Sequence, residues 1–198
     1  MCGRFFQACD GYDTRDQLGM NGGTFELEPQ GEIRPTHLVS AVLELDGQLS
    51  LRQFQWGLPH PGLSRPVINA RSETLAEKPM FRQALARRRC LIPASGWFEW
   101  RKEGSGKQAY RFSAPRPAPL FSFAGLWWPP AESLPNGAVV LITQAATQNL
   151  SEYHHRMPVA LLGAPARAWL QSGELGAALS CFDVAAHPGG GPAQGQLF

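Results

Sequence analysis

Residues 90–100 read CLIPASGWFEW, a run of mainly apolar and aromatic side chains that carries a single carboxylate, Glu99. A run of this kind is typical of a buried β-strand. Because alternate side chains of a strand point to opposite faces, we expect Trp97 and Glu99 on one face and Phe98 and Trp100 on the other. The stretch therefore predicts a strand that carries an acidic group into apolar surroundings.

Further strands are expected before and after this run. They are indicated by apolar or alternating stretches, most of them bounded by Gly, Pro, Asn or Asp. These stretches are Leu38–Leu45, Leu49–Trp56, Ala109–Phe112, Leu120–Trp127, Ala138–Thr143 and Val159–Leu162. The dipeptide Asp46-Gly47 separates the first two and indicates a β-hairpin.

Helices are expected to be few and short. Glu73–Arg88 has helical periodicity, and Pro79 should confine the main helix to the residues after it. Ala164–Gln171 predicts a second helix, and Ser151–His155 a single turn. Since strands and helices do not alternate regularly, the sequence predicts an α+β fold: a single domain with a curved, mostly antiparallel, barrel-like sheet.

The composition describes one packed globular domain. The chain has 198 residues, of which 43% are hydrophobic, with six Trp and eleven Phe. We expect this domain to span residues 2–186. Residues 187–198 contain the run PGGGP and are expected to be a disordered tail.

Charge is distributed unevenly along the chain, although the net charge is +2. Residues 71–116 contain eleven Lys/Arg and four Asp/Glu, whereas the rest of the chain contains seven and twelve. A basic segment of this kind forms either a polyanion-binding surface or an ordinary solvated face.

The cysteines and the start of the chain indicate a cytoplasmic protein. The four cysteines, Cys2, Cys9, Cys90 and Cys181, form no C-x-x-C pair. Their spacing favours neither a structural zinc site nor a disulfide framework, and we expect no metal and no cofactor. The first residues do not have the pattern of a signal peptide, and no segment approaches the length of a membrane span.

Cys2 offers unusual chemistry if Met1 is removed, which methionine aminopeptidases do when the next residue is small. A chain that begins with cysteine presents an α-amine and a thiol two carbons apart. The amine, with a pKa near 8, forms a Schiff base with an aldehyde, and the thiol then closes a five-membered thiazolidine ring. Alternatively, Cys2 is an incidental small residue.

Two further side chains are suited to proton transfer. Glu99 has apolar neighbours that would raise its pKa, as in a general acid/base, unless it is a surface or salt-bridged glutamate on an edge strand. His154 in the run His154–Pro158 could exchange protons near neutral pH, with Arg156 binding phosphate nearby. The alternative for the pair His154-His155 is a solvated loop, and adventitious metal binding is a further possibility.

Asn69 and Arg71 would lie on the same face of an extended chain. An amide and a guanidinium in this arrangement suit a sugar contact beside a phosphate contact. A turn-stabilising asparagine would give the same pattern.

These segments belong to a longer ordered series. It consists of Met1–Phe5, Pro35-Thr36, Trp56–Leu58, Ile68–Leu75, Phe81-Arg82, Arg89–Trp100, Phe123–Trp127, Ile142-Thr143 and His154–Pro158. Over residues 2–162 this series resembles the SRAP family, the SOS-response-associated peptidase domain whose members shield abasic sites in DNA.

The resemblance implies that the protein senses abasic sites in single-stranded DNA and forms a covalent thiazolidine crosslink through Cys2. Asn69 would hold the sugar or the N-terminus, and Glu99 would act as acid and base. His154 would assist opening of the sugar ring and proton transfer, while His155 has no implied role. Weak lyase activity and autoprocessing of Met1 would be side activities.

The resemblance also implies how the DNA is held. The implied DNA-binding residues are Gly3, Arg4, Pro35, Arg71, Arg82 and Arg156. A monomer that associates with the nucleoid during DNA damage is expected, with no membrane partner.

The sequence departs from the family pattern in three places. The loop Pro59–Pro66 is short and has no aromatic residue beyond His60, which bears on recognition of strand junctions. Thr143–Leu150 and the region after Leu162 also diverge.

Two other functions are compatible with the residues. An N-terminal-nucleophile cysteine peptidase or amidohydrolase would use the Cys2 thiol with the α-amine as base. A non-covalent module that binds single-stranded nucleic acid would not use Cys2 at all.

Overall fold

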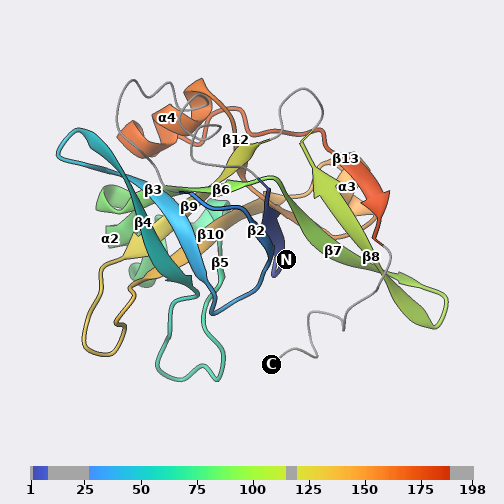
Figure 1. Ribbon diagram of the computed structural model, residues 1–198, viewed down its shortest axis with the longest axis horizontal. Helices are drawn as coiled ribbons and strands as arrows, with labels where there is room; N and C mark the ends of the chain where they lie inside the picture. Colours follow the sequence, from blue (N-terminus) through green and yellow to red (C-terminus); the bar gives the residue numbers. More distant parts are fainter. Residues whose placement is uncertain (1, 9–26, 115–119, 188–198) are drawn as a thin grey trace.

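The computed structural model describes residues 2–8, 27–114 and 120–187. Figure 1 labels the helices and most of the strands. The strands are β1 (Phe5–Gln7), β2 (Gln30–Ile33), β3 (Leu38–Leu45), β4 (Gln48–Trp56), β5 (Asn69–Arg71), β6 (Arg89–Ala94), β7 (Gly96–Glu103), β8 (Gly106–Ser113), β9 (Phe121–Trp128), β10 (Ala138–Ala145), β11 (Arg156–Pro158), β12 (Ala160–Leu161) and β13 (Asp183–Ala186). The helical segments are the 3-10 turn η1 (Ser72–Thr74), α2 (Pro79–Arg87), α3 (Gln148–Ser151) and α4 (Ala164–Ser172).

The larger of two sheets closes on itself. Its order is β11-β10-β4-β3-β6-β9-β12, and β9 also pairs with β10, so β10, β4, β3, β6 and β9 form a ring. β10 pairs in parallel with β4 and β5, whereas the other pairings between described strands are antiparallel. The predicted α+β fold with a barrel-like, mostly antiparallel sheet is confirmed. The second sheet, β13-β8-β7-β1-β2, lies beside the ring (Figure 1).

Side chains of the ring strands alternate between two apolar clusters. The first cluster extends into the second sheet and includes Ala41, Leu43, Cys90, Ile92, Phe123 and Leu141. The second includes their neighbours Val42, Leu91, Ala124, Val140 and Ile142, with Phe81 of α2 and Trp169 of α4 packed among them. Because both faces of these strands are buried, the strands are continuously apolar in sequence.

The run 90–100 forms two strands where the sequence predicted one. β6 ends at Ala94 in the ring, and β7 begins at Gly96 in the second sheet. The apolar pattern continues through the break because both strands are buried, so the pattern alone does not reveal the change of sheet.

Ser95 and Gly96 fix the point where the chain changes sheet. The Ser95 N–H donates to the carbonyl of Phe6 (3.0 Å), and its hydroxyl accepts from the N–H of Ala8 (2.9 Å). A Cβ on Gly96 would lie 2.1 Å from the carbonyl oxygen of Phe112 and 2.5 Å from the Phe6 ring. Glycine is therefore required where β1, β7 and β8 approach closely.

Local signals located the hairpin and two helices. Asp46 (φ 52°) and Gly47 (φ 73°) form the predicted tight turn between β3 and β4. α2 begins at Pro79, and α4 matches its prediction to within one residue. The turn predicted at residues 151–155 is misplaced, because α3 spans Gln148–Ser151 and the chain then extends toward β11.

Arg89 joins the ends of the two longer helices. Its guanidinium donates to the carbonyls of Leu85 and Ala86 at the end of α2. It also donates to three carbonyls at the end of α4, those of Trp169, Leu170 and Gln171. One cation therefore satisfies acceptors that a helix end leaves unpaired.

The short strands β1, β2, β5, β11 and β13 were not predicted, because segments of three or four residues carry little periodicity. Within the described residues, no helix is long and apolar enough to span a membrane. Residues 188–198 of the predicted tail lie outside the described part of the chain.

We expect Gly96→Ala to lower the free energy of unfolding by about 2 kcal/mol, because the added methyl group must displace the backbone of β8. Urea denaturation measures the change. Gly106→Ala is the matched control, since a Cβ at that position meets its nearest atom at 3.9 Å. Equal stabilities of the two variants would contradict the proposed close approach.

Candidate functional site

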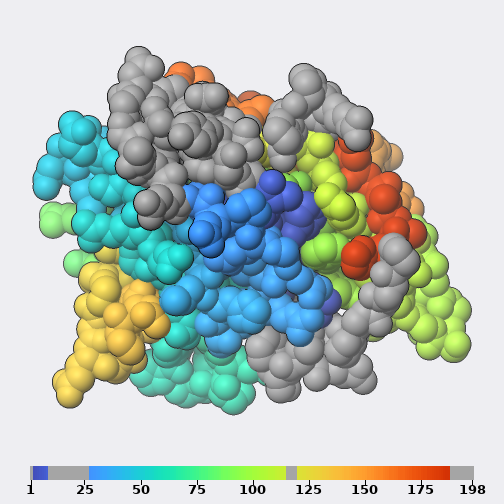
Figure 2. All heavy atoms as spheres, in the orientation of Figure 1, coloured from blue at the N-terminus to red at the C-terminus, as the bar shows by residue number. Residues whose placement is uncertain are grey.

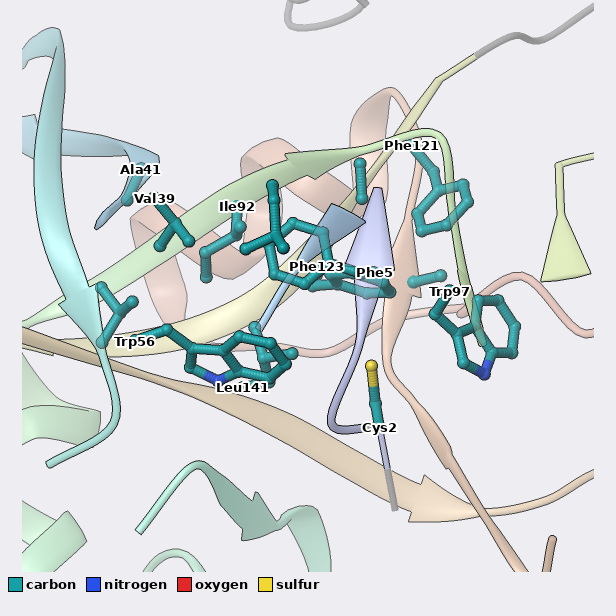
Figure 3. Close-up of a cluster of buried hydrophobic side chains, with 14 of the residues drawn as sticks. Cys2, Phe5, Val39, Ala41, Trp56, Ile92, Trp97, Phe121, Phe123 and Leu141 are labelled. Atoms are coloured by element: carbon teal, nitrogen blue, oxygen red, sulfur yellow. The ribbon is translucent and has the colours of Figure 1, made fainter. Parts of the chain in front are cut away.

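Cys2 is buried at the edge of the first apolar cluster. Its side chain has no exposed surface, and its thiol is 3.8 Å from the carbonyl of Arg4. Figure 3 shows its sulfur directed toward the cluster that contains Phe5 and Trp97. In Figure 2 the first described residues, in dark blue, form a small area between β2–β3 and the green strands of the second sheet. Cys2 and Gly3 are themselves buried, so the described chain begins inside the molecule.

The pairing of β1 with β7 sets Cys2 beside Glu99. Phe5 pairs with Trp97, and the N–H of Phe98 donates to the carbonyl of Arg4 at 2.9 Å. In this antiparallel register Gly3 lies opposite Glu99. The charge of Glu99 is accordingly one of the causes that raise the pKa of the Cys2 thiol, after the larger effect of burial.

Glu99 lies in the interior of the second sheet, with β7 between β1 and β8. Its exposed fraction is 3%, so the alternative of a surface glutamate on an edge strand is wrong. Burial raises the pKa of Glu99 to about 7, and the positive charge at the amino terminus opposes part of this shift. The carboxyl group can therefore give up and regain a proton near neutral pH.

Asn69 holds the backbone of Cys2. Asn69 begins β5, which pairs with Leu141 of β10, and its side-chain amide donates to the carbonyl of Cys2 at 2.8 Å. Two residues far apart in sequence are thus joined directly. The side-chain amide of Asn69 therefore does not stabilise a local turn, as the alternative supposed.

His154 is half-buried between α3 and β11. Its Nδ1 lies 3.0 Å from the backbone nitrogen of Arg156 and 3.1 Å from the carbonyl oxygen of the same residue. Burial lowers the pKa of His154 to about 4, with a smaller effect from the positive amino terminus. The ring is therefore neutral at pH 7, and it stacks on His155 at 4.4 Å between centroids.

Three of the four predicted catalytic residues lie together near the start of the chain. Contacts and backbone register bring Cys2, Asn69 and Glu99 together. Among the described residues, no cluster of three or more His, Cys, Asp or Glu could hold a metal ion.

Two of the predicted phosphate-binding arginines have carboxylate partners. Arg4 is buried, lies over the Trp100 ring at 4.8 Å, and donates to Glu32 at 2.5 Å. Arg156 donates to both oxygens of Glu73, at 2.6 and 2.9 Å. The sequence did not predict either glutamate as a partner of these arginines. Glu32 lies on β2, which has no sequence signal, and Glu73 lies within the segment Ile68–Leu75, where nothing indicates an ion pair.

The remaining predicted DNA-binding residues differ in exposure. Arg71 at the end of β5 is exposed, whereas Gly3 and Pro35 are buried. Arg82 is exposed on α2 and donates to the carbonyls of Ala76 and Glu77. Two of these four residues are therefore exposed to solvent, and two are buried.

The basic segment 71–116 is not a single surface. Arg89 binds the ends of two helices, and Arg101 lies on the β7–β8 hairpin with Glu103 and Glu152.

The short loop at residues 59–66 lines a hollow of about 770 Å³, and Trp128 of β9 supplies an aromatic side chain to its wall.

The raised pKa of Glu99 predicts a specific pH dependence of stability. Between pH 4.5, the ordinary pKa of a glutamate, and about pH 7, Glu99 holds a proton in the folded state that it has released in the unfolded state. Stability from this group is therefore lost as pH rises through that window. Relative to Glu99→Gln, the wild-type free energy of unfolding should fall by about 3 kcal/mol between pH 4.5 and 7.5 in urea titrations.

Glu103→Gln provides the control for this effect. Hydrogen bonds from Tyr110 and Arg101 lower the pKa of Glu103, so its contribution should change with pH in the opposite direction. Parallel pH profiles for wild type and Glu99→Gln would contradict the burial of an ionisable group.

Comparison with known proteins assigns the chain to a family. A family model described as SOS response associated peptidase (SRAP) matches residues 1–185, and thus extends past Leu162, where divergence was expected. Abasic site processing protein YoaM of Bacillus subtilis (strain 168) is 32% identical over 185 residues, covering 86% of this chain and 79% of the relative.

Abasic site processing protein YedK of Escherichia coli (strain K12) is 34% identical over 182 residues, covering 86% of this chain and 80% of the relative. The crystal structure of a phage-related protein from Bordetella bronchiseptica superposes with a TM-score of 0.81, at 28% identity and 95% coverage of both chains. From the extent of these matches, the chain belongs to the SOS response associated peptidase (SRAP) family.

Proposed function

We propose that this protein processes abasic sites in single-stranded DNA by forming a covalent thiazolidine crosslink through Cys2. One observation carries the proposal: Asn69 and Glu99, from separate strands, meet the chain at residues 2 and 3. The names of the relatives as abasic site processing proteins support the same substrate. The residues 2–186 would act as one domain.

The first step is attack of the Cys2 α-amine, freed by removal of Met1, on the C1′ aldehyde of the ring-opened deoxyribose. The carbon–nitrogen bond forms, one amine proton moves to the aldehyde oxygen, and that oxygen leaves as water, giving an imine that is protonated on nitrogen. Glu99, which is protonated in part near pH 7, donates the proton that the leaving oxygen needs. Asn69 fixes the Cys2 carbonyl during this step and so holds the amine in place.

The second step is closure of the ring by the thiol. Burial raises the pKa of the thiol, so it stays protonated until a base removes the proton. The carboxylate of Glu99 left by the first step takes that proton. Sulfur bonds to the former aldehyde carbon, and the π-electron pair of the C=N bond moves to nitrogen, which keeps its proton, so the two steps release one water in total.

His154 would assist opening of the sugar. Its ring is neutral at pH 7, so its unprotonated nitrogen can take the proton of the C1′ hydroxyl as the hemiacetal opens, and the ring oxygen takes a proton from water. Before thiazolidine closure, the same imine permits β-elimination, which accounts for a weak lyase activity. Removal of Met1 by the protein itself would account for the peptidase name of the family.

The DNA would be held through its phosphates. Arg4, Arg71, Arg82 and Arg156 supply the positive charge, with Gly3 and Pro35 lining the approach to Cys2. A single-stranded abasic site suits this arrangement because no base has to be unstacked to reach the sugar. The buried thiol implies that the first residues move when the sugar enters.

Cys2→Ala should abolish a heat-stable crosslink to a single-stranded oligonucleotide with one abasic site, because neither the thiol nor ring closure remains. Denaturing gel electrophoresis of the Met1-processed protein detects the product. Cys181→Ala is the control, since Cys181 is an exposed free cysteine. Crosslinking by Cys2→Ala at the wild-type yield would refute the mechanism.

A residue kept in front of Cys2 should also prevent crosslinking, because the amine is then a peptide nitrogen. Mass spectrometry establishes the first residue of each sample. If protein that is verified to begin at Cys2 gives no crosslink, peptide hydrolysis and non-covalent binding of single-stranded nucleic acid are the functions to test next.

Arg71→Ala should weaken binding to undamaged single-stranded DNA and reduce the slope of log K against log salt by about 0.7, the value for one lost phosphate contact. Fluorescence anisotropy at several salt concentrations gives the slope. Arg52→Ala removes another exposed strand arginine, outside the candidate site, and should leave the slope nearly unchanged.

A further inference from the structure

Arg156 presents a fork of two N–H donors that is already filled. One nitrogen donates to Glu73 Oε1 at 2.6 Å, and the other donates to Oε2 at 2.9 Å and to the carbonyl of Thr143 at 2.7 Å. The geometry is that of a bidentate guanidinium–carboxylate pair. A phosphate that used the same fork would need the positions that the Glu73 oxygens hold.

The two partners of this pair differ in exposure. The Arg156 side chain is 10% exposed and tied to β10 through Thr143, whereas the Glu73 side chain is 49% exposed. Glu73 lies in the 3-10 turn η1, which begins directly after Arg71, and its carboxylate also accepts from Ser72. Solvent therefore reaches the carboxylate of the pair, while the guanidinium is almost buried.

A second arginine of the proposed DNA site has the same arrangement. Glu32 accepts from Arg4 through Oε1 and from Arg34 through Oε2, both at 2.5 Å. Arg4 is 5% exposed and Glu32 is 35% exposed. At both places an almost buried guanidinium faces a carboxylate that solvent reaches.

We propose that Glu73 holds the place of a DNA phosphate on Arg156 and is displaced when DNA binds, which makes Glu73 a residue that determines specificity; this rests on the proposed function. Glu32 would act in the same way on Arg4. Arginine forks accept carboxylate and phosphate with the same planar geometry, so the two anions compete directly.

This competition would favour the lesion over undamaged DNA. Binding to any single strand must first break the internal ion pairs, which lowers the equilibrium affinity. Capture of an abasic site ends in a covalent bond, so the lesion is retained even when the reversible complex is weak. Because hydrogen bonds from Arg156 hold the pKa of Glu73 at about 2, the carboxylate remains a competitor throughout the neutral range.

The test compares Glu73→Gln with wild type in anisotropy measurements on an undamaged single-stranded oligonucleotide. We expect Glu73→Gln to bind about two- to fivefold more tightly, since an exposed ion pair no longer has to be broken. The slope of log K against log salt should steepen by about 0.7, because Arg156 then releases a counterion when it meets phosphate. Glu73→Ala should behave similarly.

Two controls separate this mechanism from a general change of charge. Glu152→Gln removes a carboxylate that pairs with Arg101 on the hairpin and should change both quantities far less. Arg156→Lys loses the fork, and Glu73→Gln added to it should have little further effect. Circular dichroism verifies that each variant is folded.

The outcomes are distinct. Unchanged or weaker binding by Glu73→Gln would overturn the inference and show that Glu73 orients Arg156 for DNA. An equal increase in Glu152→Gln would overturn it in favour of net charge. If undamaged DNA binds as expected but no Cys2-dependent crosslink forms on abasic DNA, the proposed function fails while the competition between Glu73 and phosphate stands.

Discussion

The pairing of β1 with β7 is the constraint on which the rest of the site depends. β1 has three residues, yet it is inserted between β2 and β7 and hydrogen bonds to both. Its register fixes the start of the chain opposite Glu99, and its Phe5 ring packs against Trp56 and Phe123 of the ring-shaped sheet. A chain end is ordinarily free to move, but here it is part of the core. Cys2 is therefore positioned by the same contacts that stabilise the fold.

Burial also determines the protonation states in the site. The thiol of Cys2, the carboxyl of Glu99 and the imidazole of His154 are all shifted toward their neutral forms, with burial as the largest cause in each case. Neutral groups suit a reaction between an amine and an aldehyde, which begins without a formal charge on either partner. The charged arginines Arg4 and Arg156 are paired with glutamates whose carboxylates reach solvent.

The sequence predicted the parts of this structure that local chemistry decides. The β3–β4 hairpin followed from Asp46-Gly47 and the start of α2 from Pro79, since each depends on backbone preferences within a few residues. The change of sheet at Ser95 was missed because it depends on Phe6 and Phe112, which are distant in sequence.

The residues of the candidate site also fall into two groups, those that local sequence predicts and those that depend on distant segments. The chemistry of Cys2, Glu99 and His154 could be argued from residue type, and their resemblance to a family supplied the set. The partners Glu32 and Glu73 could not be predicted, because an ion pair between distant segments leaves no periodic signal. Likewise, residue type alone would place Arg4 and Arg156 at the surface. Their burial follows from tertiary packing.

Arg89 shows how the last part of the chain can stay attached while its sequence varies. Its five acceptors are main-chain carbonyls at the ends of α2 and α4. Every amino acid supplies such a carbonyl, so substitutions on the solvent side of α4 leave the attachment intact. One side chain of β6 therefore attaches α4, and the amino acids on the exposed side of α4 can vary without loss of this attachment.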